Sequence, residues 1–163
     1  MSSGPGARRA AIALGTNLGN RRAALEFATT RLRAILTGLV VSDAVETEPE
    51  GEGLEGQPLY LNAVAVGEST LDARELLDAL LAIEAEFGRE RPSPRAPRTL
   101  DLDLILLGDQ VVHEPGLDLP HPRFRERFFV LGPLAEIAPA FVDPVTGRRA
   151  VDLLRALLQN KER

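Results

Sequence analysis

Two amphipathic helical segments, each flanked by strand-like apolar runs, constrain the fold of this chain more than any other feature. The first helix is predicted to start at the capping residue Asn20 and to end before Gly38. The second starts at Asp72, which forms a capping box with Glu75, and ends at Gly88. The residues expected to face a sheet are Leu25, Ala28, Leu32, Ile35 and Leu36 in the first helix and Leu76, Leu80, Ile83 and Phe87 in the second.

Four apolar runs around these helices predict strands. They cover residues 10–14, 39–47, 59–67 and 100–107, and the last run is the strongest strand pattern in the chain. The order of elements is therefore β-α-β-β-α-β. That order is the split βαβ arrangement of a ferredoxin-like fold.

A C-terminal extension follows this core. It contains a short strand at 111–112, an apolar segment around 128–131 and a last amphipathic helix. The apolar stripe of that helix consists of Val151, Leu154, Leu157 and Leu158. We predict an α+β fold, with a ferredoxin-like βαββαβ core and an extension that covers the second face of the sheet. The result is a three-layer α-β-α sandwich.

Composition fits a single domain that spans residues 1–163, with residues 1–7 as a disordered tail. The chain is 44% hydrophobic and 26% charged, and it has no cysteine, which excludes a thiol nucleophile and a zinc–thiolate site. No stretch approaches the ~20 apolar residues of a membrane span, and the first residues carry no signal-peptide pattern. We therefore expect a cytoplasmic protein that does not act at a membrane. We also predict a monomer.

The charge is unevenly distributed along the chain. The net charge of −5 and the aromatic content of 4% argue against nucleic acid as a partner. Residues 89–98 nevertheless hold four Arg against one Glu, and residues 123–127 hold three Arg against one Glu. Such clusters suit a focused anion site, although each cluster taken alone also fits solvated loop charges.

Two carboxylates open the strongest predicted strand. Asp101 and Asp103 are two residues apart, so their side chains are expected on one face, together with Ile105 and Leu107. Read alone, the pair favours a solvated strand face over a metal site. The two magnesium ions of a phosphoryl-transfer site lie ~3.5–4 Å apart, and carboxylates at this spacing can hold them.

Arginines just upstream favour the metal site over the solvated strand face. Arg98 lies three residues before Asp101, and Arg89 and Arg91 lie in the preceding loop. Guanidinium groups bind phosphate oxygens bidentately, although some of these arginines are expected to be ordinary surface cations. The combination favours a substrate made of a metal ion and a polyphosphate.

Other candidate residues are more ambiguous. His121 lies between two prolines and can donate to a phosphate, take part in proton transfer or simply occupy a turn. Tyr60 and Asn62 share a strand face, which suits a planar heterocycle or ordinary packing. Glu84 lies near the apolar stripe of the second helix and can anchor a ligand or cap the solvent edge. The glycine-rich segment 15–20 lacks the Walker lysine and is predicted to be only a tight turn.

Five motifs, in this order along the chain, resemble the 6-hydroxymethyl-7,8-dihydropterin pyrophosphokinase family. The resemblance runs from about Ala10 to Leu158, and the block at 97–103 is its most specific part. The motifs are Ala13-Leu14-Gly15-Thr16-Asn17-Leu18-Gly19, Tyr60-Leu61-Asn62-Ala63, Pro97-Arg98-Thr99-Leu100-Asp101-Leu102-Asp103, Pro120-His121-Pro122 and Pro133-Leu134-Ala135-Glu136-Ile137-Ala138-Pro139. The resemblance implies an enzyme of folate biosynthesis that moves the β,γ-pyrophosphoryl group of ATP to the pterin hydroxymethyl group and leaves AMP.

The resemblance also implies roles for individual residues. Asp101 and Asp103 would hold two Mg²⁺ ions, and they are predicted to be catalytic together with Arg89, Arg91 and Arg98. Contacts to ATP are implied for Glu84, Arg89, Arg91, Arg98, Leu104, His121 and Arg127. Contacts to the pterin are implied for Thr47, Glu48, Tyr60, Asn62, Asp101 and Phe129, with Tyr60 and Phe129 on either side of the ring.

One alternative is a non-catalytic ferredoxin-like module that binds a nucleotide or metabolite for regulation. The Asp101 and Asp103 pair argues against it, because a regulatory site does not need two metal-holding carboxylates. An RNA-binding sheet is excluded by the net charge and by the lack of paired aromatic residues on the central strands.

Overall fold

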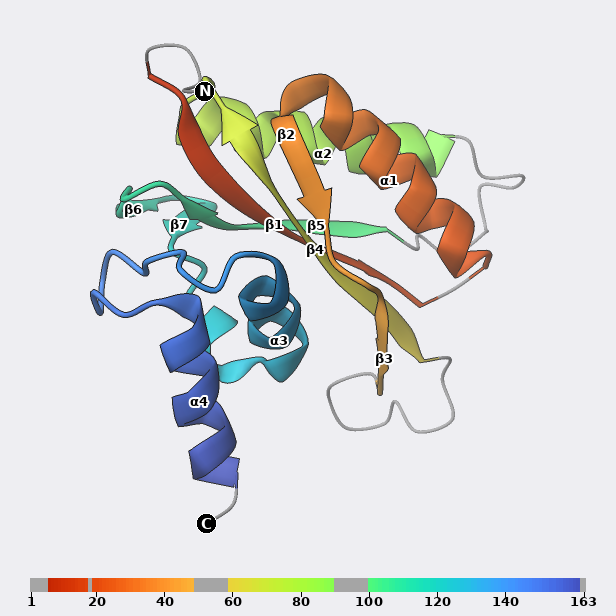
Figure 1. The fold of residues 1–163 in the computed structure, drawn as a ribbon. Helices are drawn as coiled ribbons and strands as arrows, with labels where there is room; N and C mark the ends of the chain where they lie inside the picture. The colour runs from red at the N-terminus through yellow and green to blue at the C-terminus, as the bar shows by residue number, and fades with distance from the viewer. Residues whose placement is uncertain (1–5, 18, 49–58, 90–99, 162–163) are drawn as a thin grey trace.

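The computed structural model describes residues 6–17, 19–48, 59–89 and 100–161 of the chain. Figure 1 shows how helices and strands alternate along these residues. The elements are β1 (Arg8–Thr16), α1 (Arg21–Ile35), β2 (Thr37–Val41), β3 (Val45–Thr47), β4 (Tyr60–Ser69), α2 (Ala73–Arg89), β5 (Asp101–Leu107), β6 (Val112–Glu114), β7 (Leu117–Leu119), the 3₁₀ turn η1 (Phe124–Glu126), α3 (Phe128–Ile137) and α4 (Ala150–Lys161).

The main sheet is antiparallel and has the strand order β2-β4-β1-β5. The short strand β3 also pairs with β4, beyond the end of β2. A separate hairpin joins β6 to β7. The predicted mixture of helices and sheet is confirmed, and β1 and β4 occupy the central positions where alternating small and branched apolar residues pack on both sides.

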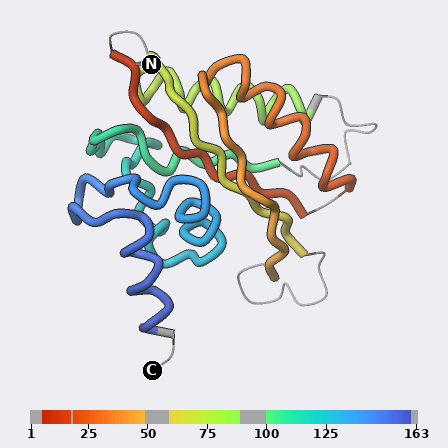
Figure 2. The backbone as a smooth tube through the Cα atoms, viewed as in Figure 1, coloured from red at the N-terminus to blue at the C-terminus, as the bar shows by residue number. Residues whose placement is uncertain are grey.

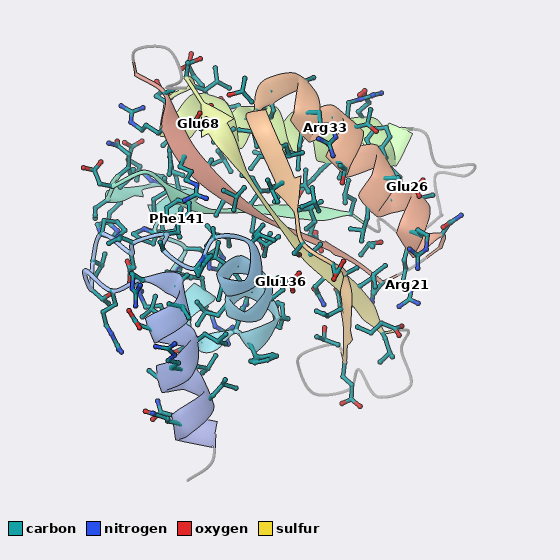
Figure 3. The ribbon with its side chains drawn as sticks, in the orientation of Figure 1. Arg21, Glu26, Arg33, Glu68, Glu136 and Phe141 are labelled. Atoms are coloured by element: carbon teal, nitrogen blue, oxygen red, sulfur yellow. The ribbon has the colours of Figure 1, made fainter. Side chains whose placement is uncertain are left out.

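One face of the sheet is covered by α1 and α2 (Figure 2). Leu32 of α1 and both Leu76 and Leu80 of α2 are fully buried against Ile12 and Leu102 of the sheet. The predicted helical stripes therefore do face the sheet. The opposite side of α1 is polar: Glu26 and Arg33 are exposed and project from the helix surface (Figure 3).

The opposite face of the sheet is covered by the C-terminal extension. Leu131 and Leu134 of α3 pack against Val64 and Val66 of β4. Helix α4 packs on α3, with Leu153 buried in the same cluster. This second layer places the start of α3 over the sheet.

The N-termini of α1 and α2 follow the predicted capping chemistry. Asn20 Oδ1 accepts a hydrogen bond of 3.0 Å from the amide of Ala23. Asp72 Oδ1 accepts from the amide of Glu75 at 2.8 Å, and Glu75 Oε1 accepts from the amide of Asp72 at 3.0 Å. These bonds satisfy amides that the helices themselves cannot pair.

The strand predicted over 39–47 is wrong in one respect, because it is divided into β2 and β3. The division lies at Ser42, whose backbone amide still donates to Val64 O at 2.9 Å. The hydroxyl oxygen of Ser42 accepts from the amide of Val64, also at 2.9 Å. The Ser42 hydroxyl therefore accepts the hydrogen bond that a backbone carbonyl would otherwise accept from the Val64 amide. This replacement interrupts the ladder.

A β-bulge in β5 makes a second prediction wrong. Ala11 of β1 pairs with Leu106 and Ile12 pairs with Leu104, so Ile105 is the extra residue. Ile105 lies on the α3 side, the same face as Asp101 and Asp103, as predicted, but Leu107 belongs to the core under α1 and α2. Strict alternation along the strand fails at this bulge.

The extension differs in detail from the prediction. The short strand expected at 111–112 is observed as the hairpin β6–β7, and the segment at 128–131 is the start of α3. In α4, Leu154 and Leu157 do pack inward, but Leu158 is 41% exposed, so its predicted burial is wrong. Within the part of the chain that the structure describes, no helix is both long and apolar enough to cross a membrane.

Candidate active site

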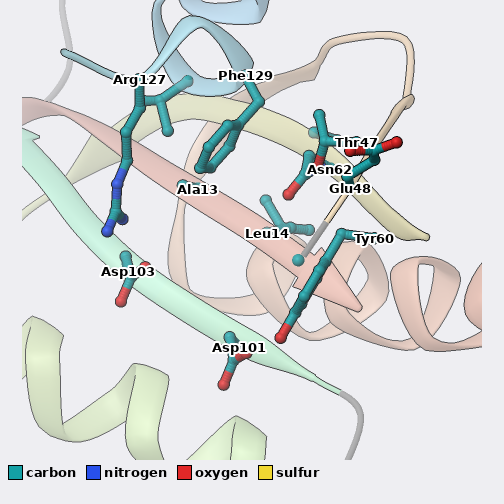
Figure 4. A pocket seen from close by; sticks show the side chains of 13 residues that line it. Ala13, Leu14, Thr47, Glu48, Tyr60, Asn62, Asp101, Asp103, Arg127 and Phe129 are labelled. Atoms are coloured by element: carbon teal, nitrogen blue, oxygen red, sulfur yellow. The ribbon is translucent and has the colours of Figure 1, made fainter. Parts of the chain in front are cut away.

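A cavity of about 300 Å³ lies on the α3 side of the sheet, where β1 and β3 end and β4 and β5 begin (Figure 4). It is lined by side chains from all four strands and from the start of α3. The lining residues are Ala13, Leu14, Gly15, Thr47, Glu48, Tyr60, Asn62, Ala63, Asp101, Asp103, Arg127, Phe129 and Val130. The structure thus brings together residues that are separated by more than eighty positions in the chain.

The floor of the cavity is made by small residues of β1. Ala13 and Gly15 alternate along the strand and therefore point to the same face. A Cβ atom at Gly15 would lie 3.4 Å from Asn62 Oδ1, at the edge of the space that a ligand would need. From the sequence, Ala13 is placed in a predicted strand and Gly15 at the start of a segment predicted to be only a tight turn. The signal that could have found its role is the run of small residues at every second position of a strand.

One wall of the cavity is a hydrogen-bonded group on β3 and β4. Asn62 is buried, and its Nδ2 donates to Thr47 Oγ1 at 2.7 Å and to Val45 O at 3.4 Å. Tyr60 lies two residues before Asn62 and turns its ring into the cavity (Figure 4). The predicted pair therefore does share a cavity with Thr47.

The opposite wall comes from the start of α3. Phe129 points into the cavity, and the guanidinium group of Arg127 lies 5.7 Å from the centre of the Phe129 ring. Figure 4 shows Arg127 reaching toward Asp103, with the rings of Phe129 and Tyr60 entering the cavity from different elements. A flat aromatic ligand could lie between these two rings, since offset aromatic contacts are favourable.

Asp101 and Asp103 form the third side of the cavity. Both carboxylates are exposed and project from the α3 face of β5. Within the described residues, no group of three or more histidine, cysteine or acidic side chains is arranged to hold a metal ion. Two carboxylates at an open cavity nevertheless fit Mg²⁺, which takes few protein ligands and completes its coordination with water and phosphate oxygens.

The outer edge of β5, which is the edge not paired with β1, carries further polar groups. The amide of Leu102 donates to Glu84 Oε2 at 2.6 Å, so the backbone of Leu102 faces this edge. Leu104 lies two residues on, before the bulge, and its backbone amide and carbonyl therefore face the same edge. A donor and an acceptor side by side could pair with the edge of a purine base.

His121 lies next to this edge rather than in the lining of the cavity. Its backbone amide donates to Ile105 O at 2.9 Å, and its Nδ1 accepts from the amide of Arg123 at 3.2 Å. Burial lowers the pKa of His121 below its ordinary value; Asp103 acts in the opposite direction, whereas Arg127 adds to the lowering. The neutral imidazole therefore carries its proton on Nε2 and can donate it to an anion.

Three predicted arginines stay predictions. The backbone of Arg89 ends α2, and Arg91 and Arg98 lie outside the described residues. Glu84, predicted as an ATP contact, is buried on α2 and directed at the backbone of β5.

The sequence is similar to that of several known proteins. Residues 11–139 match the sequence model of a family described as 7,8-dihydro-6-hydroxymethylpterin-pyrophosphokinase. A Synechocystis protein named 2-amino-4-hydroxy-6-hydroxymethyldihydropteridine pyrophosphokinase is 41% identical over 145 residues, which cover 89% of this chain and 74% of the relative. A Pseudomonas aeruginosa protein of the same name is 40% identical over 157 residues, covering 91% of each chain.

The fold is also similar to that of solved structures. The wild-type Plasmodium falciparum HPPK-DHPS crystal structure superposes with a TM-score of 0.73 at 12% sequence identity. The match covers 94% of this chain but 45% of that one, so the chain spans less than half of the longer protein. At this identity the similarity concerns the fold alone.

Proposed function

The chain belongs to the 7,8-dihydro-6-hydroxymethylpterin-pyrophosphokinase family, and on this premise we propose that it makes the pyrophosphate ester of a hydroxymethyldihydropterin in folate biosynthesis. The β,γ-pyrophosphoryl group of ATP moves to the hydroxymethyl oxygen. The bond between the β-phosphorus and the oxygen that bridges to the α-phosphorus breaks, and AMP leaves with that oxygen. The hydroxyl proton is released to solvent.

The observation that carries this proposal is the division of one cavity into two chemically different halves. Tyr60, Phe129 and the Asn62–Thr47 pair line the half that suits a flat, hydrogen-bonding heterocycle. Asp103 and Arg127 line the half that suits metal and phosphate. A hydroxymethyl group on a pterin held in the first half would point toward the second.

We assign the pterin half to Thr47, Glu48, Tyr60, Asn62 and Phe129. The two rings would hold the pterin from its faces, while Asn62 Oδ1 would accept from its edge. The small floor residues Ala13 and Gly15 leave the space that the bicyclic ring requires.

We assign the phosphate half to Asp101 and Asp103, which would hold two Mg²⁺ ions. Arg127 and His121 would contact the phosphates, and the backbone of Leu104 would contact the adenine base. When bound, the metal ions would neutralise charge on the triphosphate and favour the alkoxide of the attacking hydroxymethyl group. Arg127 and neutral His121 would donate to phosphate oxygens as negative charge builds up. Arg89, Arg91 and Arg98 stay predicted phosphate contacts and catalytic residues.

We further propose that the fold is a ferredoxin-like βαββαβ core in a three-layer α-β-α sandwich. Support comes from the antiparallel order β2-β4-β1-β5 and from the helices on both faces. We treat residues 1–163 as one domain that acts as a monomer on small molecules in the cytoplasm. These points stay predictions, as does the absence of nucleic acid and membrane partners.

The products formed from ATP test the proposed function. Phosphorus NMR of a reaction with Mg²⁺, ATP and 6-hydroxymethyl-7,8-dihydropterin should show AMP and a pterin pyrophosphate in equal amounts. Omission of the pterin should leave ATP intact. Formation of ADP would contradict the proposed function. Tight magnesium-independent binding of a non-hydrolysable ATP analogue, without turnover of ATP, would instead favour the regulatory module.

A further inference from the structure

Glu84 is a buried carboxylate that contacts the strand carrying the two aspartates. Glu84 lies in α2 and is only 8% exposed. Its Oε2 accepts the 2.6 Å hydrogen bond from the amide of Leu102. A buried carboxylate is costly unless it is hydrogen-bonded, and a charged acceptor makes this bond short and strong. The contact is therefore a fixed feature of the core rather than a surface encounter.

The position of this bond along β5 is what matters for the site. The Leu102 amide belongs to the peptide group that joins Asp101 to Leu102, and Leu102 itself separates the two aspartates. On the other edge of β5, Asp101 pairs with Gly15 and Asp103 pairs with Ala13. The first three residues of the strand are thus held by β1 on one edge and by Glu84 on the other.

The helix that carries Glu84 is itself firmly placed. Leu76, Leu80 and Ile83 of α2 are buried against the sheet, and Ile83 directly precedes Glu84. The capping box of Asp72 and Glu75 fixes the start of the same helix. Through this hydrogen bond, the firmly packed helix α2 fixes the position of the peptide group between Asp101 and Leu102.

We propose that Glu84 is a positioning residue that sets the separation and direction of the Asp101 and Asp103 carboxylates for metal binding. The proposal rests on the proposed function of that pair. It assigns to Glu84 a role through the backbone of β5, in place of the direct contact with ATP that the sequence predicts. Groups that orient metal ligands commonly raise metal affinity by about tenfold or more.

Two variants separate the hydrogen bond from the charge. Glu84→Gln keeps an oxygen acceptor at the same distance from the backbone but removes the charge. Glu84→Asp keeps the charge but is one methylene shorter, so its carboxylate no longer reaches the Leu102 amide. Glu86→Gln on the same helix is the matched control, because Glu86 pairs with Arg31 of α1 at 2.8 Å.

Two measurements are made on each variant and on the wild type. Amide hydrogen exchange by NMR reports the protection of Leu102. Calorimetry with Mn²⁺ and a non-hydrolysable ATP analogue reports metal affinity without turnover, and the Mg²⁺ dependence of AMP formation gives the corresponding kinetic value.

Glu84→Asp should lose Leu102 protection and bind Mn²⁺ about tenfold more weakly. Glu84→Gln and Glu86→Gln should stay close to the wild type in both measurements. Wild-type metal affinity in Glu84→Asp with Leu102 unprotected would overturn the proposal. So would weak metal binding in Glu84→Gln with Leu102 still protected, because charge and not position would then be responsible. Failure of the wild type to form AMP would contradict the proposed function but would leave the exchange and calorimetric results to decide the role of Glu84.

Discussion

The side-chain amide of Asn62 donates a hydrogen bond of 2.7 Å to the hydroxyl oxygen of Thr47, across the adjacent strands β4 and β3. Because the nitrogen is engaged by Thr47 and by Val45 O, Oδ1 is directed over Gly15 at the floor of the cavity. Because Val45 O can only accept a hydrogen bond, it determines which end of the Asn62 amide faces a ligand, and the bond to Thr47 holds the side chain in that orientation.

Replacing Thr47 by valine should weaken pterin binding while the shape of the wall is retained. The lost hydrogen bond is worth about 0.5–1.5 kcal/mol, so KM for the pterin should rise about 2- to 10-fold. KM for ATP should stay the same, as steady-state kinetics with each substrate varied will show. Thr30→Val, at an exposed position of α1, is the control; an equal change in both KM values would contradict the assignment.

Asp101→Asn and Asp103→Asn should each lower turnover by roughly 10²–10⁴-fold, because each removes a proposed metal ligand. The melting temperature should change little, since both carboxylates are exposed. Asp109→Asn, an exposed aspartate in the turn after β5, is the matched control and should retain full activity. A large drop in melting temperature with proportionate loss of activity would point instead to a structural role.

His121 predicts a pH dependence of stability. Burial, as the largest cause, lowers its pKa in the folded state, so between that value and the unfolded value of about 6.5 the unfolded chain binds more protons. The free energy of unfolding should therefore fall as the pH drops below about 6.5 and level off below the folded-state pKa. Chemical denaturation of the wild type and of His121→Gln between pH 5 and pH 8 should show that the free energy of unfolding depends less steeply on pH in the variant. Equal pH dependence in the two proteins would rule out His121 as the source of the effect.

Asp143 should be a polar residue of the extension that is sensitive to substitution. It is 1% exposed, and it accepts two hydrogen bonds from Arg125, at 2.6 and 2.9 Å. Burial alone would raise the pKa of Asp143, but the bonds from Arg125, Thr146 and Val145 outweigh it and lower the pKa. Asp143→Ala should cost about 2–4 kcal/mol of unfolding free energy, measured by urea denaturation at pH 7.

The lowered pKa of Asp143 also predicts how its contribution to stability changes in acid. The stability that Asp143 contributes is present above its unfolded pKa and is lost as the pH falls through the lower folded value, so the difference between wild type and variant should shrink there. Asp152→Ala is the control, because Asp152 pairs with Arg149 on the surface and should change the melting temperature little. Similar losses in the two variants would show that burial of Asp143 is not the cause.

Local chemistry made several elements predictable. Asn20 and the pair Asp72 and Glu75 identify helix starts because a side-chain acceptor can satisfy only the amides within one turn of it. The buried helical stripes were predictable for a related reason, because apolar residues at helical spacing have to face a core. These are relations between residues a few positions apart, and the sequence states them directly.

The bulge at Ile105 and the break at Ser42 were not predictable in this way. Each depends on how two strands distant in sequence pair. A single unpaired residue reverses the faces of the later residues in the strand, whereas a side chain that replaces a backbone partner interrupts the ladder. The misplaced face of Leu107 is the direct result.

The sequence by itself determined the family, the two aspartates on one strand face and the capped helices that surround them, because short motifs and short-range periodicity encode these features. Only the tertiary structure decided that Asn62 is held by Thr47 and Val45, that Ala13 and Gly15 form the cavity floor, and that Glu84 is directed at the backbone of β5. The physical reason is that these contacts join residues at least fifteen positions apart. Their partners are chosen by sheet register and helix packing, which depend on the whole chain at once.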